Sequence, residues 1–297
     1  MKKILGFIAM VCFCLTTSFS QELRIGIRAG VELARFSGPS EIDVNGNDLE
    51  SNTWKSGFHF GISTDLKFSD RFGLLSDIVF VQAGTRYDYQ GDGQLWLKGT
   101  VNNFPHDEII TGDRSDILTV NNAYLEIPIR PYIRFGRLRL GAGISLNTLL
   151  ISKANGEVKM TGRSKNDRPT SPETIAFNVE ANYFTDPSKY TPPNEPQEII
   201  VDNLPIIAPT NVNGYAENED VDENYFNRFD VAVIGDVSFF LNSGLYLSFA
   251  FSQGLLDITN NNVDFYKNNF DDAEQSFPRS DDKDIQQNMR ISLGFSF

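Results

Sequence analysis

The chain has 297 residues and a formal net charge of −13, with 39 acids against 26 lysines and arginines. This acidity argues against a nucleic-acid partner, because phosphates attract lysine and arginine. The only two cysteines, Cys12 and Cys14, lie near the start, so the rest of the chain can form neither a disulfide framework nor a thiolate metal site. We expect no cofactor.

Residues 1–20 have the features of a secretory signal peptide. Two lysines begin the segment, an uncharged and mainly apolar stretch runs to Leu15, and small residues precede the predicted cleavage between Ser20 and Gln21. An N-terminal membrane anchor is the alternative, but the apolar stretch is shorter than the roughly 20 residues that a spanning helix needs. Cleavage would remove two lysines and no acid, so the net charge would fall from −13 to −15.

Eight later stretches alternate apolar and polar residues, as strands with one apolar face do. The predicted strands cover residues 23–36, 57–68, 72–89, 119–135, 137–150, 228–241, 244–258 and 289–297. In the third, Val79 and Val81 would face inward and a bulge is expected near Gln82 to Gly84. An apolar face opposite a small and polar face suits a wall with lipid outside and a narrow lumen inside.

The connections between these strands alternate in length. The short ones are 69–71, a turn at Gly136 and 242–243, and the long ones are 37–56, 90–118, 151–227 and 259–286. Residues 21–297 are therefore predicted to form one all-β domain. Its expected fold is an eight-stranded antiparallel up-and-down transmembrane β-barrel in the cell outer membrane, with short periplasmic turns and long extracellular loops. A soluble β-sandwich is the alternative, but it has no reason to place every long loop at one end.

The last strand carries an apparent signal for insertion into the membrane. Its apolar face ends in Phe295 and Phe297, and a terminal phenylalanine resembles the C-terminal signal by which outer-membrane barrels are recognised. We therefore expect outer-membrane lipid and the barrel-insertion machinery among the partners of this chain.

The inward faces of the predicted strands carry acids and bases together. The predicted lumen charge network consists of Asp65, Asp77, Glu126, Arg130, Arg134, Arg139, Asp230, Asp236 and Arg290. An eight-stranded barrel has space only for side chains or one small ligand, and unpaired buried charges are costly. The pattern favours a salt-bridged plug; the alternative, a selective polar channel or a small-ligand site, needs a wider lumen.

Neither catalysis nor metal binding has a strong signal. The chain has two histidines, His59 and His106; a pairing with Asp88 or Ser145 is conceivable, but no spacing requires it and no G-x-S-x-G motif is present. We expect no enzyme. The acidic run 217–224 is oxygen-rich and could bind Ca²⁺, but it lacks the EF-hand order, which favours a solvated loop and no metal site.

The chain resembles the PorT-type outer-membrane β-barrel proteins of the Bacteroidetes. The resemblance rests on Gly26 and Gly30 in the first strand, on Leu-Glu-Ile-Pro-Ile at 125–129 and on the final Gly-Phe-Ser-Phe, and the oversized loop 151–227 departs from it. It implies the location and the fold; the best-known member takes part in protein export by the type IX pathway.

We therefore expect a structural or interaction role, with an unknown protein partner bound through the extracellular loops. A component of a secretion or envelope assembly is one form of this role. The alternative is a narrow porin for small solutes, and an enzyme comes third.

Overall fold

The computed structural model describes residues 22–165, 172–183, 197–201, 203–208, 224–269, 271 and 276–297. The predicted signal peptide, with its cleavage site at Ser20 and Gln21, lies outside the described residues. So does the acidic run 217–224 apart from Asn224.

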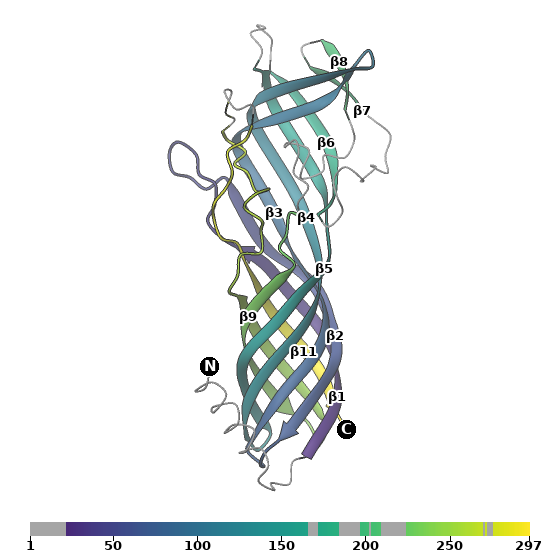
Figure 1. The fold of residues 1–297 in the computed structure, drawn as a ribbon, viewed down its shortest axis with the longest axis vertical. Coiled ribbons are helices and arrows are strands. Elements are labelled where there is room, and N and C mark those ends of the chain that lie inside the picture. The colour runs from purple at the N-terminus through teal and green to yellow at the C-terminus, as the bar shows by residue number, and fades with distance from the viewer. Residues whose placement is uncertain are drawn as a thin grey trace, which may run out of the picture.

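The regular structure of the described residues consists of antiparallel β-strands (Figure 1). They are β1 (Glu22–Ser37), β2 (Glu50–Lys67), β3 (Phe72–Val101), β4 (Phe104–Phe135), β5 (Leu138–Ser164), β6 (Glu173–Asn182), β7 (Gln197–Val201), β8 (Leu204–Ala208), β9 (Phe229–Phe240), β10 (Leu245–Gly254) and β11 (Ile285–Ser296). Within the described part of the chain, no helix is long and apolar enough to cross a membrane.

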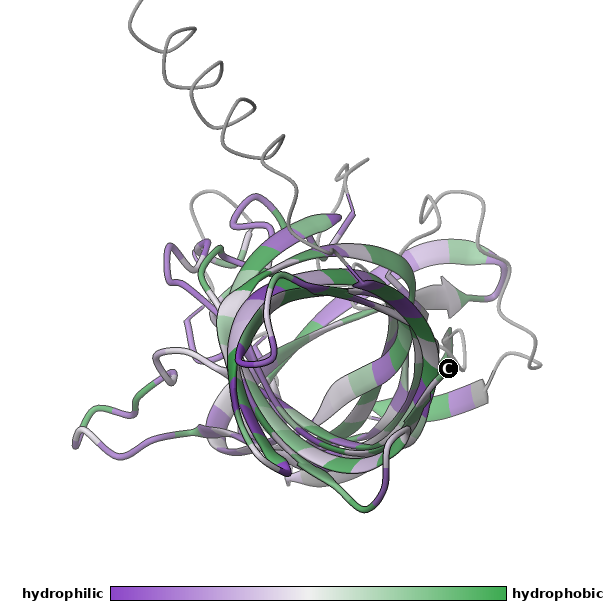
Figure 2. Ribbon diagram, turned by 90° about the horizontal axis from the view of Figure 1, so that it is seen from below, coloured by the Kyte–Doolittle hydropathy of each residue, from purple (hydrophilic) through white to green (hydrophobic). Residues whose placement is uncertain are grey.

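Eight of these strands pair in a ring. The order is β1–β2–β3–β4–β5–β9–β10–β11, and β11 returns to β1, where Gly26 lies opposite Ser296. Figure 2 shows the ring end-on, with hydrophilic and hydrophobic residues alternating along its strands. Closure leaves no strand edge of the ring unpaired, which is what a sheet surrounded by lipid requires.

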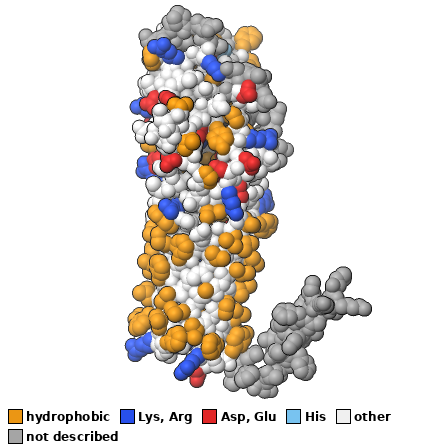
Figure 3. Space-filling model, turned by 90° about the vertical axis from the view of Figure 1, so that its left-hand side faces the viewer, with side chains coloured by type: hydrophobic (Ala, Val, Ile, Leu, Met, Phe, Trp, Pro, Cys, Tyr) orange, Lys and Arg blue, Asp and Glu red, His pale blue; other side chains and the backbone are white. Residues whose placement is uncertain are grey.

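The alternation predicted for the wall is confirmed. On β1, Ile27 and Val31 are each 55% exposed, whereas Arg28 and Glu32 are buried. Val79 and Val81 face inward, as expected. On the face drawn in Figure 3 the outward apolar residues cover the lower half of the molecule, and each of the eight ring strands contributes exposed apolar residues, so they form a belt. An apolar surface that surrounds the whole ring is suited to contact lipid rather than water.

The three short turns are also confirmed. β2 and β3 are separated by residues 68–71, β4 and β5 by 136–137, and β9 and β10 by 241–244. Gly136 has a φ of 59°, a left-handed conformation that glycine adopts without a steric penalty. The bulge lies at the expected height, but the extra residue belongs to the neighbouring strand, between Trp54 and Phe58 of β2.

The prediction of a loop at 90–118 is wrong. β3 and β4 continue past the belt as one long hairpin that turns at Asn102 and Asn103, and they pair without interruption up to Val101 and Phe104. Leu95, Leu97 and Ile110 point to one side and are buried. The other side faces water instead of lipid, so most outward positions are polar and the regular apolar alternation that marks the wall is lost.

The predicted loop 151–227 is likewise partly regular. β5 continues to Ser164, β6 pairs with β5, and β7 and β8 form a small hairpin that touches β3 at Thr100. Residues Glu198–Val201 form most of β7. We call the part beyond the belt the head; it comprises the described residues within 38–50, 87–118, 154–226 and 255–284. Its far end has a core of its own, formed by Leu95, Leu97, Ile110, Val158, Met160, Ile175, Ile199, Val201 and Ile206.

Candidate functional site

Arg130 joins one side of the lumen to another. This β4 side chain lies between Asp236 of β9, at 3.1 Å from Nη1 to Oδ1, and Asp77 of β3, to which Nη2 donates a hydrogen bond. Asp77 also accepts a bond of 2.8 Å from Arg28 of β1. All four side chains are at most 5% exposed on their side-chain surface, so these charges are paired with one another and not with water.

Arg290 makes the longest connection across the lumen. Its guanidinium on β11 binds both oxygens of Glu32 on β1, at 2.8 and 3.0 Å, and Oε2 of Glu126 on β4, at 2.8 Å. β4 and β11 are four strands apart in the ring of eight, so they form opposite walls. An ion pair between opposite walls occupies the space that a channel would need.

A third group of charges lies toward the short turns. Arg139 of β5 binds Asp65 of β2 at 3.2 Å, and the Tyr132 hydroxyl donates to the same carboxylate at 2.7 Å. Arg139 also stacks over the rings of Tyr132, Phe240 and Tyr246, at 5.0 to 5.3 Å. Cation–π contacts of this kind add to the ion pair when the group is desolvated.

Two residues of the predicted network lie apart from these ion pairs. Arg134 donates to the carbonyl of Gly136 at 2.9 Å and stacks over Phe240 at the turn end of the barrel. Asp230 accepts from Asn147 at 3.2 Å and from the backbone N–H of Leu256 at 3.3 Å. The other seven pair with opposite charges, and Arg28 and Glu32 of β1 join them.

His59 lies in a constellation that the sequence did not suggest. Its Nε2 is 2.7 Å from Oγ of Ser292, and its Nδ1 is 3.1 Å from Oε2 of Glu32. Neither partner considered from the sequence takes part, because Asp88 accepts from Arg86 and Ser145 donates to Asn147. The order serine, histidine, carboxylate is that of a hydrolytic triad. Here, however, Ser292, His59 and Glu32 are each at most 1% exposed.

An apolar plug lies above the ionic network, where the barrel meets the head, and includes residues of both. Its residues are Ala34, Phe36, Val79, Val81, Ala83, Val120, Tyr124, Leu149, Ala154, Tyr183, Phe226, Ile258 and Val263. Phe226 packs against Phe36, Tyr183 and Tyr225 with ring centroids 4.9 to 5.5 Å apart. The interior is therefore filled twice, by charges in the wall region and by apolar side chains above them.

The head contains a cavity of about 130 Å³ next to this plug. Aromatic rings line it, among them Tyr87, Tyr225, Phe226 and Phe265, together with charged residues of β2, β4 and the segment 255–284. Lys267 enters it: its Nζ lies 3.3 Å from Glu50 and 4.5 Å from the centroid of the Tyr87 ring. On the face drawn in Figure 3, acidic and hydrophobic side chains lie side by side above the belt.

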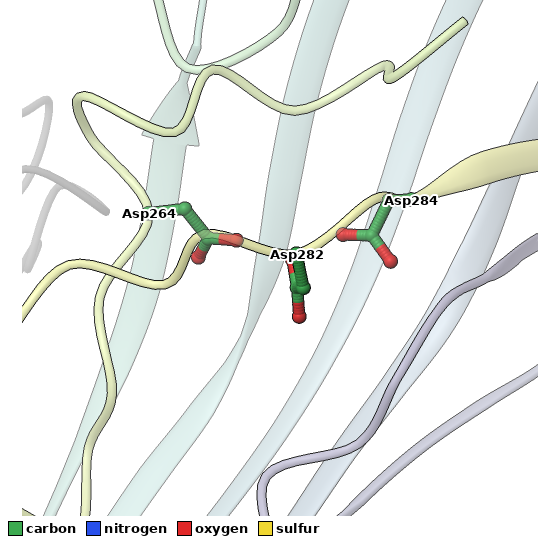
Figure 4. Close-up of side chains that lie close together, drawn as sticks. All are labelled: Asp264, Asp282 and Asp284. Atoms are coloured by element: carbon green, nitrogen blue, oxygen red, sulfur yellow. The ribbon is translucent and has the colours of Figure 1, made fainter.

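Three carboxylates of the segment 255–284 lie close together (Figure 4), and all three line the cavity. Oxygens of Asp264, Asp282 and Asp284 lie within 4.8 Å of one another, which is a ligand set that a cation could use. Burial raises the pKa of Asp264 to about 6. Burial and the neighbouring aspartates raise that of Asp284 to about 7. Burial is the first cause of both pKa shifts because it disfavours the charged carboxylate, and the neighbouring carboxylates add to it.

The sequence matches the model of one protein family over most of its length. The model is described as the outer membrane protein beta-barrel domain, and the match covers residues 19–260. The chain belongs to this family. The belt, the ring and the ionic lumen thus belong to an outer membrane β-barrel, and the protein resides in the cell outer membrane.

Several solved structures resemble this outer membrane β-barrel at low identity. Ail, the attachment invasion locus protein of Yersinia pestis, is 11% identical with a TM-score of 0.34, over 93% of this chain and 99% of that chain. OprG from Pseudomonas aeruginosa is 10% identical with a TM-score of 0.35, over 93% and 97%. The outer membrane protease OmpT from Escherichia coli is 9% identical with a TM-score of 0.32, over 95% and 99%. These scores are too low to support an inference about function, and no curated protein matches the chain.

The sequence did not suggest the cavity of this β-barrel. The described residues that line it lie within 36–52, 85–87, 114–120, 158, 183, 225–226, 259–267 and 280–284, and most of these positions were predicted to be loops. The one available signal was the aromatic and acidic composition of 264–284, which contains Phe265, Tyr266 and Lys267. Composition alone does not say which rings and charges face each other.

Proposed function

We propose that this protein is a closed outer membrane barrel that acts through its head, as an interaction protein displayed on the cell surface. The observation that carries the proposal is Arg290, which bonds Glu32 and Glu126 and so ties opposite walls together. A barrel whose lumen is held shut in this way has only its head available for recognition.

The direction of the head follows from the ends of the chain. β1 begins and β11 ends at the same end of the ring as the three short turns, and the head lies at the other end. Barrels of this class keep short turns in the periplasm and long segments outside. The head is therefore extracellular in our proposal, with the predicted signal peptide directing export.

A PorT-type role within a secretion or envelope assembly of a Bacteroidetes cell is the finer form of this proposal. Its support is the sequence resemblance in the wall, where Leu125–Ile129 lies on β4 and Gly26 and Gly30 face β11 across a close strand contact. A partner protein would bind the head, since the wall is committed to lipid.

A porin and a hydrolase fit the geometry less well. A porin needs a continuous polar path, and the ion pairs and the plug lie across it. A hydrolase at Ser292 needs an accessible hydroxyl, whereas Arg28 donates to Oγ of Ser292 at 2.8 Å and the group is enclosed.

Conductance and surface labelling test the proposal. The purified protein in planar bilayers should give no steady current, and large, stable single-channel steps would favour the porin instead. Because both cysteines precede residue 21, single cysteines can be introduced without background. A membrane-impermeant maleimide should label Phe104→Cys at the tip of the head in intact cells. Asp70→Cys in a short turn should react only after the outer membrane is permeabilised, and the reverse pattern would invert the topology.

A further inference from the structure

The cavity in the head carries more acid than base. Among the described residues, six carboxylates line it, from Glu41, Glu50, Asp116, Asp264, Asp282 and Asp284, against two cations, Lys267 and Arg114. The cavity therefore presents a strongly negative interior next to aromatic rings.

Part of this charge is compensated by the chain itself. Arg114 binds Asp116 at 2.9 Å, Lys267 binds Glu50 at 3.3 Å, and Glu41 accepts the backbone N–H groups of Lys267 and Asn268. The three aspartates make no ion pair with a lysine or arginine in the described part of the chain. Their hydrogen bonds come from neutral groups, such as the Tyr225 hydroxyl to Asp264 at 3.2 Å. Oδ1 of Asp282 is buried and has no hydrogen-bond partner among the described residues.

The surroundings of Lys267 show that the interior of the cavity can hold an ammonium group. Its ammonium group is held by a carboxylate, by a tyrosine hydroxyl and by the faces of two rings, Tyr87 at 4.5 Å and Tyr89 at 5.3 Å. Rings and carboxylates together are the usual means by which proteins bind alkylammonium groups. The rings of Tyr225, Phe226 and Phe265 and the three aspartates offer the same combination a second time.

The size of the cavity limits the ligand. At about 130 Å³ it is slightly smaller than the engineered cavity of roughly 150 Å³ that admits benzene. A ligand of about six or seven heavy atoms fits such a space. A bare metal ion would leave the aromatic side of the cavity unfilled, and a larger molecule would not enter.

We propose that the cavity binds a small organic ammonium ion. The cationic group lies against Asp264, Asp282 and Asp284, and the aliphatic part lies against Tyr225, Phe226 and Phe265. The ligand is thus recognised by charge and by aromatic contact together. This assignment deepens the recognition role proposed above and rests on it for its biological meaning, but binding itself is measured without reference to the orientation of the head.

Calorimetry on the purified full-length protein in detergent tests the assignment, with choline as the probe. Its neutral isostere 3,3-dimethylbutan-1-ol has the same shape without the charge, and we expect it to bind at least about tenfold more weakly. Asp282→Asn should weaken choline binding about tenfold. Asp281→Asn, the matched control, removes the same charge one residue away, where the side chain is exposed, and should change the affinity less than about twofold. Asp264→Asn serves in place of Asp282→Asn if the latter does not fold.

Three results would overturn the assignment. Equal binding of choline and the neutral isostere would make the site merely apolar. Equal losses in Asp281→Asn and Asp282→Asn would reduce the effect to general electrostatics. Failure of choline to bind, whether or not Ca²⁺ binds in an Asp282-dependent way, would exclude an organic cation. None of these results would affect the conductance and labelling tests, so the two proposals can fail separately.

Discussion

Replacement of Arg130 by methionine should destabilise the barrel by about 3 kcal/mol. Removal of one member of a buried ion pair costs about 3–5 kcal/mol, because the other charge stays buried without its partner. Asp77 retains Arg28 at 2.8 Å, so its charge is still paired. Asp236 retains only the Ser238 hydroxyl at 3.1 Å, so it bears most of the loss, and we expect the lower end of the range.

Urea unfolding in lipid vesicles, followed by the fluorescence of Trp54 and Trp96, measures this loss. Asp236→Asn added to Arg130→Met should restore at least about 1 kcal/mol, because the orphaned charge is then removed. Arg134→Met is the matched control. Arg134 lies on the same strand, β4. Its replacement removes one hydrogen bond to a carbonyl and one ring contact, so we expect the free energy of unfolding to fall by about 1 kcal/mol. If Arg130→Met costs no more than Arg134→Met, the lumen is not closed by these ion pairs.

Three further outcomes are expected. Deletion of Phe295 to Phe297 removes the end of the strand that closes the ring on β1, so heat-modifiable protein should disappear from outer-membrane fractions; normal amounts would contradict the insertion role. The pKa of Asp284 is raised to about 7, so the folded head binds extra protons between about pH 4 and 7. Stability should therefore rise as the pH falls from 8 to 5, choline binding should weaken, and Asp284→Asn should flatten the change in the urea midpoint. Gly136→Ala should cost about 1 kcal/mol in the same unfolding assay, because φ is 59° there; an unchanged midpoint would mean that the turn tolerates a side chain.

The wall of the barrel could be predicted because lipid enforces a simple rule. Every second residue must be apolar along the whole crossing, and Ile27, Val31 and their neighbours follow that rule without a miss. The head follows a weaker rule, since its outer face meets water. Residues 90–118 contain Gly91, Gly93 and Gly99 among polar residues, so they read as a loop although they form the longest hairpin.

The partners within the lumen could be predicted in kind but not in detail. Parity placed Arg130, Asp77 and Asp236 on the inner face, and pairing of opposite charges followed from the cost of burying them. Which acid meets which base depends on the stagger between strands that are not neighbours, such as β4 and β11. The proximity of His59 to Ser292 depends on the same stagger, and no local pattern in the sequence encodes it.

The strands β3, β4 and β5 run from the membrane into the head without a break. Crossing the bilayer takes about 9–11 residues of a tilted strand. The stretch of β3 beyond the belt, Arg86–Val101, then rises roughly 40 Å farther at 3.3 Å per residue and a tilt of about 40°. The cavity lies at the base of this extension, where Thr85 and Tyr87 of β3 line it, and no break in β3 separates it from the membrane. Its height and direction above the cell surface are fixed by the barrel, and whatever binds there is held at a set distance from the lipid.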